Sequence, residues 1–263
     1  MARGSALWTV MTGAAQKAGR ALRRDFGEVE QLQVSNKGPS DFVSAADLKA
    51  EKTLRTELQK ARPRFGFLME ESGEVPSEDG KHRWIIDPID GTTNFLHGIP
   101  HFAISIALEM EGEVIAGLVY NPIVEEMFYA EKGKGAFLND HRLRVSSRNR
   151  MSEAVIATGI PFLGRPGHKP FLDQMGRVMA EVAGIRRMGA ASLDLAYVAA
   201  GRYEGFWETG LQAWDIAAGV LLVREAGGFA TDYKGGKDVV HNGNVVAANS
   251  KLHKQILDLV TKG

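Results

Sequence analysis

The chain has 263 residues with 32 basic and 32 acidic side chains, so its formal net charge is zero. This balance argues against a partner held by bulk charge, and we expect no membrane association and no direct nucleic-acid binding. Apolar residues make up 44% and charged residues 24%, which excludes a disordered or collagen-like chain. There are no cysteines, so any bound metal must have oxygen or imidazole ligands. No run of about 18 apolar residues occurs, and we predict a cytoplasmic protein.

Two helices followed by a series of strands are predicted in the first half of the chain. Apolar residues at helical spacing predict a helix over residues 5–26. Ser44 is placed to cap a second helix, which Pro63 ends. Strand-like runs then follow at residues 65–69, 84–87, 103–110, 114–120 and 126–131, and the last three predict an antiparallel meander.

Beyond residue 145 the pattern changes to short strands and helices in alternation. The segments with strand character are 154–158, 205–208 and 245–249, and those with helical character lie near 171–182, 193–200 and 216–225. We therefore predict one domain over residues 1–263 with two lobes, 1–145 and 146–263, and no flexible linker between them.

The most informative stretch is Asp87-Pro88-Ile89-Asp90-Gly91-Thr92-Thr93-Asn94. Its two carboxylates stand three residues apart at the end of a hydrophobic strand, and they would repel each other unless a cation lay between them. Such hard oxygen ligands favour magnesium or manganese. The glycine allows close approach of the backbone, and the residues after it could open a helix whose N-terminus attracts phosphate. The alternative is a strand-to-helix turn with capping residues and no ligand.

Two further acidic elements strengthen the metal hypothesis. Glu70 and Glu71 follow an apolar run, and because neighbouring strand residues point to opposite faces, we expect only Glu70 to face a metal. Asp215 stands at the opening of an apolar helix, where it could equally be an N-cap. Three separated acidic elements, each at an element end, fit a hydrolase with two metal ions.

Three segments resemble the signatures of the inositol monophosphatase family, namely residues 67–72, 87–95 and 214–219. These are magnesium-dependent, lithium-sensitive phosphatases related to fructose-1,6-bisphosphatase. The likeness extends over nearly the whole chain, and residues 189–202 are most similar to bacterial inositol-1-monophosphatases of the extragenic-suppressor type. The resemblance implies an α+β fold, a layered αβαβα sandwich of the sugar-phosphatase type, and a homodimer.

The resemblance also implies roles for particular residues. Glu70, Asp87 and the backbone carbonyl of Ile89 would hold one magnesium ion. A second ion would be held by Asp87, Asp90 and Asp215. Asp47 and Thr92 would help Glu70 to orient the attacking water. The other implied roles are phosphate binding by the amides of Gly91 and Thr92, polyol contacts from Asp90, Gly189, Ala190, Glu208 and Asp215, and a mobile-loop lysine, Lys37, near a weaker third metal site.

The predicted function is therefore magnesium-dependent hydrolysis of inositol-1-phosphate by a metal-activated water. Manganese could replace magnesium, and lithium is expected to inhibit. The same chemistry on fructose-1,6-bisphosphate, a nucleotide bisphosphate or histidinol phosphate stays open. So does a catalysis-independent role in transcription or ribosomal RNA maturation through contact with the transcription machinery.

Several other residues receive no catalytic role. We interpret His97 and His101 as turn or core residues, because metal-bound water needs no imidazole base. The arginines between Arg142 and Arg150, and the pair Arg186-Arg187, are interpreted as solvated or interface residues. The meander and the 142–150 region are candidates for a dimer interface.

Overall fold

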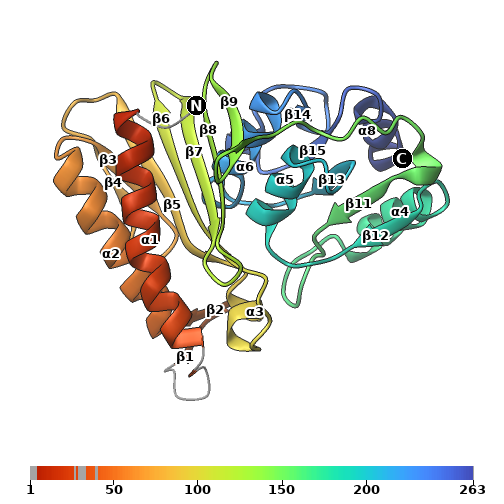
Figure 1. Ribbon diagram of the computed structural model, residues 1–263. Helices are drawn as coiled ribbons and strands as arrows, with labels where there is room; N and C mark the ends of the chain where they lie inside the picture. The colour runs from red at the N-terminus through yellow and green to blue at the C-terminus, as the bar shows by residue number, and fades with distance from the viewer. Residues whose placement is uncertain (1–4, 27, 29–33, 39–40, 263) are drawn as a thin grey trace.

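The computed structural model describes residues 5–26, 28, 34–38 and 41–262, and for residues 34–38 and 41–43 it describes the backbone alone. Within these residues, two larger sheets alternate with three layers of helices (Figure 1). The layered αβαβα sandwich predicted from the sequence is confirmed. None of the described helices is long and apolar enough to cross a bilayer.

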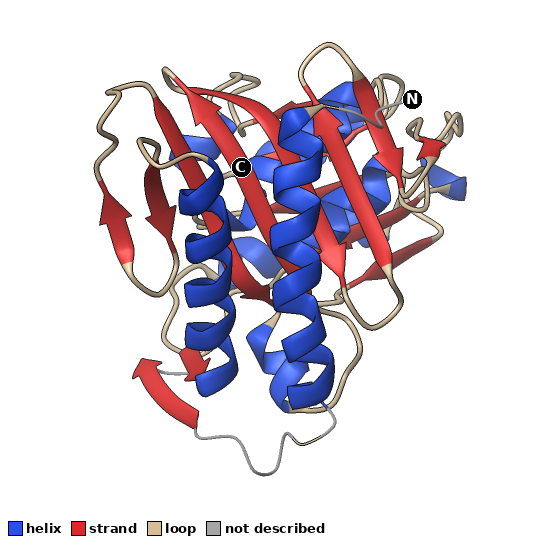
Figure 2. Cartoon of the chain, turned by 60° about the vertical axis from the view of Figure 1, so that its left-hand side comes forward, coloured by secondary structure: helices blue, strands red, loops and turns tan. Residues whose placement is uncertain are grey.

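Two long helices form the first layer. They are α1 (Ala6–Phe26) and α2 (Ala45–Ala61), which lie side by side on one face of the first sheet (Figure 2). Helix α2 begins after Ser44, whose hydroxyl accepts hydrogen bonds from the backbone N–H groups of Ala46 and Asp47. Both predicted helices and the predicted cap are therefore present.

The first sheet has eight strands in the described part of the chain, in the order β10-β9-β8-β7-β6-β5-β3-β4. Strand β5 runs parallel to β3, and the strands from β5 to β10 are antiparallel to their neighbours, as the predicted meander required. The bounds are β3 (Gly66–Met69), β4 (Gly73–Val75), β5 (His82–Asp90), β6 (Ala103–Met110), β7 (Glu113–Asn121), β8 (Glu126–Glu131), β9 (Gly135–Leu138) and β10 (His141–Arg142).

The second sheet, with five described strands, lies in the C-terminal half in the order β12-β11-β13-β15-β14. Helices α4 (His168–Met179) and α8 (His253–Thr261) cover its outer face (Figure 1). Helix α8 was not predicted from the sequence. The strand bounds are β11 (Val155–Thr158), β12 (Gly184–Arg186), β13 (Gly205–Glu208), β14 (Phe229–Thr231) and β15 (Val245–Ala248).

Helices α5 (Ala191–Ala199) and α6 (Ala213–Glu225) form the middle layer and are covered from both sides. Most of their residues are buried, which explains why neither helix has an amphipathic sequence. Gly117 on β7 admits α6 to close range, because a Cβ at this position would lie 2.9 Å from the Cα of Ala218. A helix of the second half thus packs on the sheet of the first half, and the division near residue 145 stays a prediction.

Short elements complete the described chain. Strands β1 (Val34–Gly38) and β2 (Asp41–Ser44) form a hairpin before α2. Lys37 therefore lies on a strand and not in the loop predicted for it, and its side chain is outside the described part of the structure. The remaining elements are α3 (Thr92–Leu96), the 3₁₀ turn η2 (Met151–Glu153) and α7 (Val239–Asn242).

Candidate active site

An irregularity at the end of β5 brings Asp87 and Asp90 to the same side of the sheet. Residues three apart on a regular strand point to opposite faces. Here Asp87 pairs with Ser105 and Asp90 pairs with Ala103, so β5 holds one extra residue between them. Such a bulge re-aims the side chain that follows it. Both carboxyl groups consequently line one cavity.

Two acidic side chains in this cavity accept hydrogen bonds from residues that are distant from β5 in the sequence. Asp90 Oδ2 accepts hydrogen bonds from the backbone N–H of Ser192, at 2.7 Å, and from its hydroxyl, at 2.5 Å. Asp215 Oδ2 accepts the backbone N–H of Gln212 at 2.7 Å. Asp215 is the third residue of α6, so the alternative that it is the N-cap of this helix is wrong.

Thr92 lies at the start of α3 between two oxygen atoms. Its Oγ1 is 3.1 Å from Asp47 Oδ1 and 3.0 Å from the carbonyl oxygen of Ile89. Asp47 is fully buried, and its other oxygen accepts the backbone N–H and the hydroxyl of Ser44. A threonine hydroxyl has one proton to donate and lone pairs to accept another hydrogen bond. The bond to Asp47 can therefore fix the orientation of the Thr92 hydroxyl, whose lone pairs stay available to accept a hydrogen bond from a third group.

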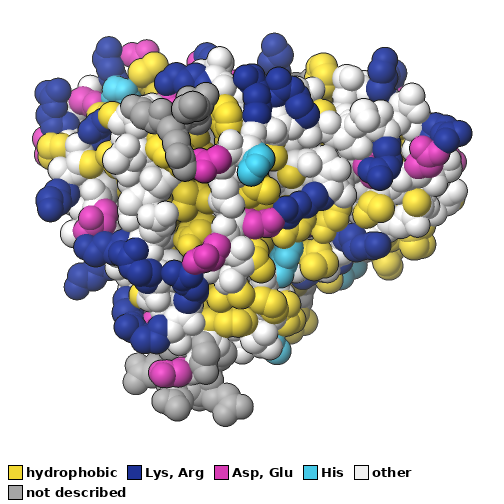
Figure 3. All heavy atoms as spheres, viewed as in Figure 1, with side chains coloured by type: hydrophobic (Ala, Val, Ile, Leu, Met, Phe, Trp, Pro, Cys, Tyr) yellow, Lys and Arg dark blue, Asp and Glu magenta, His cyan; other side chains and the backbone are white. Residues whose placement is uncertain are grey.

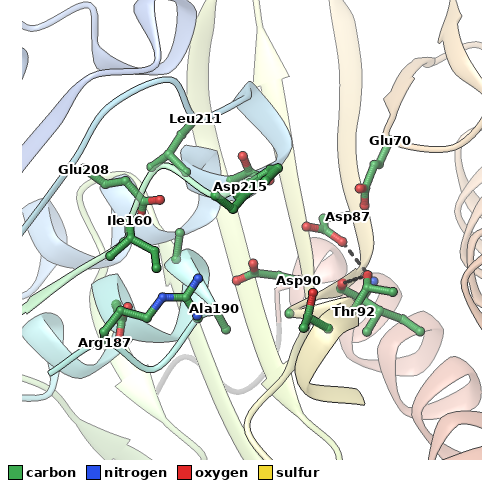
Figure 4. Close-up of a pocket in the computed structure, with 18 of the residues that line it drawn as sticks. Glu70, Asp87, Asp90, Thr92, Ile160, Arg187, Ala190, Glu208, Leu211 and Asp215 are labelled. Atoms are coloured by element: carbon green, nitrogen blue, oxygen red, sulfur yellow. Dashed lines mark hydrogen bonds between the residues drawn. The ribbon is translucent and has the colours of Figure 1, made fainter. Parts of the chain in front are cut away.

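The residues of the predicted metal site, although distant in sequence, surround a single cavity of about 370 Å³. Figure 4 shows Glu70 and Asp87 on one side, Glu208 and Leu211 on the other, and Asp90 and Asp215 between the two sides. The predicted residues in the lining are Glu70, Asp87, Ile89, Asp90, Gly91, Thr92, Gly189, Ala190, Glu208 and Asp215. Asp47 reaches the cavity only through its bond to Thr92.

Glu70 lies in the turn between β3 and β4, just after the end of β3. The strand alternation that we used to choose Glu70 over Glu71 therefore does not apply. Glu70 lines the cavity, whereas Glu71 is not among the lining residues. The choice agrees with the structure, but the turn, not the pleat of a strand, separates the two side chains.

Burial and mutual repulsion raise the pKa values of the cavity carboxyls. The pKa of Asp87 lies well above its ordinary value, first because of burial and then because Glu70, Asp90 and Asp215 are nearby. Burial and Asp90 raise the pKa of Asp215 to about 8. Burial raises that of Asp90 to about 6, although both bonds from Ser192 act in the opposite direction. A positive charge placed among these groups would relieve the repulsion.

One wall of the cavity is formed by lining residues from position 159 onward and is called the C-terminal wall. It contains charged residues that the sequence analysis missed. Asp194 on α5 is 1% exposed, and its Oδ1 has no hydrogen-bond partner among the described residues. Arg165 and Arg187 also line the cavity and act against the raised pKa of Glu208, which burial and Asp90 bring to about 8. Arg187 is exposed, as the interpretation of a solvated residue requires, but its place in the cavity lining was not predicted. The sequence did contain a signal for Asp194, because an acidic residue within an otherwise apolar helix, residues 191–199, indicates a functional position.

Gly91 lets the two walls of the cavity approach each other. Its φ of +95° is in the left-handed region, and a Cβ there would lie 3.1 Å from the carbonyl oxygen of His101 and 3.3 Å from Ala190 Cβ. Nearby, the Asn94 side chain donates hydrogen bonds to the carbonyl oxygens of His101 and Met188. The backbone after β5 is thus fixed against the segment before α5.

We expect Gly91→Ala to lower both stability and phosphatase activity. The strained φ costs about 1–3 kcal/mol, and the contact with the 189–190 segment would push the cavity walls apart. Thermal unfolding and phosphate release check this result. Gly112→Ala is a matched control, because it has φ +84° but nothing within 4 Å of the added Cβ. It should lose stability alone, and equal loss of activity in both variants would contradict the role given to Gly91.

The histidines after the main motif and the arginines of the 142–150 region lie where the sequence analysis placed them. His101 is buried and His97 accompanies the turn after α3, as expected. Arg148 pairs with the buried Glu204, and Arg150 pairs with Glu153. On the face shown in Figure 3, basic side chains are spread over several elements with acidic ones among them. This distribution agrees with an interpretation as surface and salt-bridging residues.

Comparison with known proteins identifies the class of enzyme to which this fold and cavity belong. The chain is 61% identical over 262 residues to the inositol-1-monophosphatase of Mesorhizobium japonicum, and the match covers 100% of this chain and 98% of that protein. The protein is accordingly a phosphatase. The model of the inositol monophosphatase family matches residues 5–262, so the chain belongs to this family.

Two further comparisons extend this assignment. The crystal structure of the extragenic suppressor protein suhB from Bartonella henselae is 60% identical, with a TM-score of 0.96, and the match covers 98% of this chain and 100% of that chain. The Nus factor SuhB of Salmonella typhimurium is 43% identical over 249 residues, which are 95% of this chain and 93% of that protein. The chain is therefore similar both to proteins named as phosphatases and to proteins named as Nus factors.

Proposed function

We propose that this protein is a magnesium-dependent phosphomonoesterase that hydrolyses inositol-1-phosphate to inositol and phosphate. The observation that carries the proposal is the position of Asp87, whose carboxyl group interacts with those of Glu70, Asp90 and Asp215 at the floor of one cavity. The names of the relatives at 59–61% identity support the substrate.

The carboxyl groups of the cavity suit a divalent metal by their chemistry and charge. Among the described residues, no three carboxylate or imidazole side chains already have the geometry of an assembled metal cage. Six carboxyl groups nevertheless line the cavity, with no thiol among them, and the raised pKa of Asp87 is the response expected where negative charges lack a counterion. Hard oxygen donors select magnesium or manganese, so these residues fit a site for one of these divalent metal ions.

In this proposal, Glu70, Asp87 and the Ile89 carbonyl would hold one ion, and Asp87, Asp90 and Asp215 would hold a second. The ions would supply an acidified water and neutralise the departing alkoxide. Asp47 orients the Thr92 hydroxyl, which together with Glu70 positions the attacking water in line with phosphorus. The amides of Gly91 and Thr92 receive the phosphate. No covalent nucleophile is needed.

The leaving group would occupy the C-terminal wall. We propose that Asp90, Asp215, Glu208 and the 189–190 backbone contact the hydroxyls of the polyol. Gly159 leaves room for the carboxyl group of Glu208, because a Cβ at this position would lie 1.8 Å from Glu208 Oε1. Arg165 and Arg187 on the same wall favour a second candidate, a substrate with another phosphate such as fructose-1,6-bisphosphate or a nucleotide bisphosphate.

Phosphate release from a panel of substrates tests the proposal. We expect turnover of inositol-1-phosphate that requires magnesium, is supported by manganese, and is inhibited by lithium. The panel also includes fructose-1,6-bisphosphate, a nucleotide bisphosphate and histidinol phosphate. A kcat/KM at least about tenfold higher on a bisphosphate would replace the proposed substrate, and magnesium-independent activity would refute the metal mechanism.

Two associations belong to the same proposal. The family likeness supports a homodimer, which sedimentation of the purified protein checks. Similarity to proteins named Nus factors supports contact with the transcription machinery as an additional role. A cellular phenotype that is rescued by a catalytically dead variant would show that the second role does not need hydrolysis. A cytoplasmic location stays a prediction.

A further inference from the structure

Helix α2 has a second buried carboxylate one turn after Asp47. Glu51 is 2% exposed and lies four residues further along the helix, a spacing that places both side chains on the same helix face. Asp47 is already connected to the cavity through Thr92. No sequence signature assigned Glu51 a role, and it does not line the cavity.

Glu51 bonds to the turn that follows Glu70. Its Oε2 accepts the backbone N–H of Glu71 at 2.8 Å, and its Oε1 accepts the hydroxyl of Ser72. The backbone N–H of Glu70 itself donates to the carbonyl oxygen of Ile86, on β5, at 3.2 Å. The turn is thus fixed on one side by the strand that carries Asp87, and on the other side by helix α2.

These contacts matter because Glu70 is the proposed metal ligand that does not lie on a strand or helix. Asp87 and Asp90 lie on β5, and Asp215 lies on α6. A ligand carried by a short turn can adopt several positions unless its neighbours are held, and residues that hold metal ligands typically change metal affinity when they are altered. Glu51 supplies two such bonds from a buried position on a long helix.

We propose that Glu51 is a positioning residue that fixes the 70–72 turn and thereby sets the affinity of the Glu70 metal site. This inference rests on the proposed metal-dependent function. It makes α2 the element that orients both the water-positioning hydroxyl, through Asp47, and the Glu70 carboxylate, through Glu51.

The test measures metal binding directly, with Mn²⁺ as the probe, by electron paramagnetic resonance of the purified full-length protein. In Glu51→Gln, one acceptor oxygen becomes an amide NH₂ group, and we expect the Mn²⁺ dissociation constant to rise about tenfold. Ser72→Ala removes one of the two bonds at an exposed residue and should cause a smaller rise. Glu57→Gln makes the same chemical change on the same helix, where Glu57 pairs with Lys17, and should bind Mn²⁺ as the wild type does.

Two further readouts separate positioning from general stability. The concentration of magnesium that gives half-maximal phosphate release should rise in parallel with the Mn²⁺ dissociation constant. The KM for substrate at saturating magnesium should stay unchanged. A lower unfolding temperature with wild-type Mn²⁺ affinity would mean that Glu51 is only structural, and would overturn the inference. If Glu51→Gln does not fold, Ser72→Ala decides, because wild-type affinity in that variant also overturns it.

The outcomes for the wild type distinguish this inference from the function on which it rests. If the wild type binds Mn²⁺ but releases no phosphate from any monoester, and Glu51→Gln binds Mn²⁺ about tenfold more weakly, the proposed function fails while the role of Glu51 stands. If the wild type hydrolyses its substrate and Glu51→Gln binds Mn²⁺ equally well, the role of Glu51 fails alone. Absence of Mn²⁺ binding by the wild type overturns both.

Discussion

Asp87→Asn is expected to lower kcat by about 10³-fold or more. Its carboxylate is proposed to bridge both metal ions, so the change weakens two sites at once, and metal ions typically contribute several kcal/mol to such a transition state. Single-turnover and steady-state phosphate release at saturating magnesium measure the effect. Activity close to that of the wild type would refute the metal mechanism.

The same substitution should not damage the fold. Asp87 is one of four interacting carboxyl groups, and replacing it with a neutral amide of similar size relieves repulsion in the metal-free protein. We therefore expect the unfolding temperature of metal-free Asp87→Asn to equal or exceed that of the wild type. Asp173→Asn, on the exposed side of α4 where Asp173 pairs with Lys169, is the control and should keep full activity.

The metal-free protein is expected to lose stability as the pH rises from 6.5 to 8.5, and magnesium should restore it. The folded-state pKa values of Asp215 and Glu208 are about 8, above ordinary values of 3.8 and 4.5. Between these limits the folded state binds more protons than the unfolded state, so the free energy of unfolding falls with rising pH. The loss is complete above the folded-state pKa values.

Thermal unfolding in a chelator, with and without added magnesium, measures this effect. We expect a decrease of about 5 °C or more between the two pH values, because 1 kcal/mol corresponds to about 2–4 °C in a domain of this size. Burial lowers the pKa values of His101 and His253, so these two groups act in the opposite direction, and their effect ends once the pH is well above the ordinary value of 6.5. Asp215→Asn should show a shallower decrease, and an increase in stability with pH in the wild type would contradict the prediction.

The long elements were predictable from the sequence because their patterns are local. Apolar spacing identified α1, and the alternation of strand and turn residues identified the meander. The short edge strands β4, β10, β12 and β14 have only two or three residues each, too few for a periodic signal. The helix α3 opened after Gly91 as expected, but it has only five residues.

The cavity was predictable only where its residues cluster along the chain. Asp87, Asp90 and Thr92 belong to one short motif, whereas Ser192 approaches Asp90 from 102 residues away. Arg187 illustrates the limit of sequence reasoning. An arginine pair has the composition of a surface segment, and only the packing of α5 against the end of β5, through the bonds from Ser192 to Asp90, places one of the two in the cavity lining.

The close contact between Gly117 and Ala218 has a consequence for how the chain folds. The inner face of the first sheet is covered by a helix that follows about a hundred residues later in the chain. A fragment ending near residue 145 would therefore expose this apolar surface to solvent. Such a truncated polypeptide should aggregate when synthesised alone. During synthesis, the first half of the chain can therefore bury this face of its sheet only after residues 213–225 have left the ribosome.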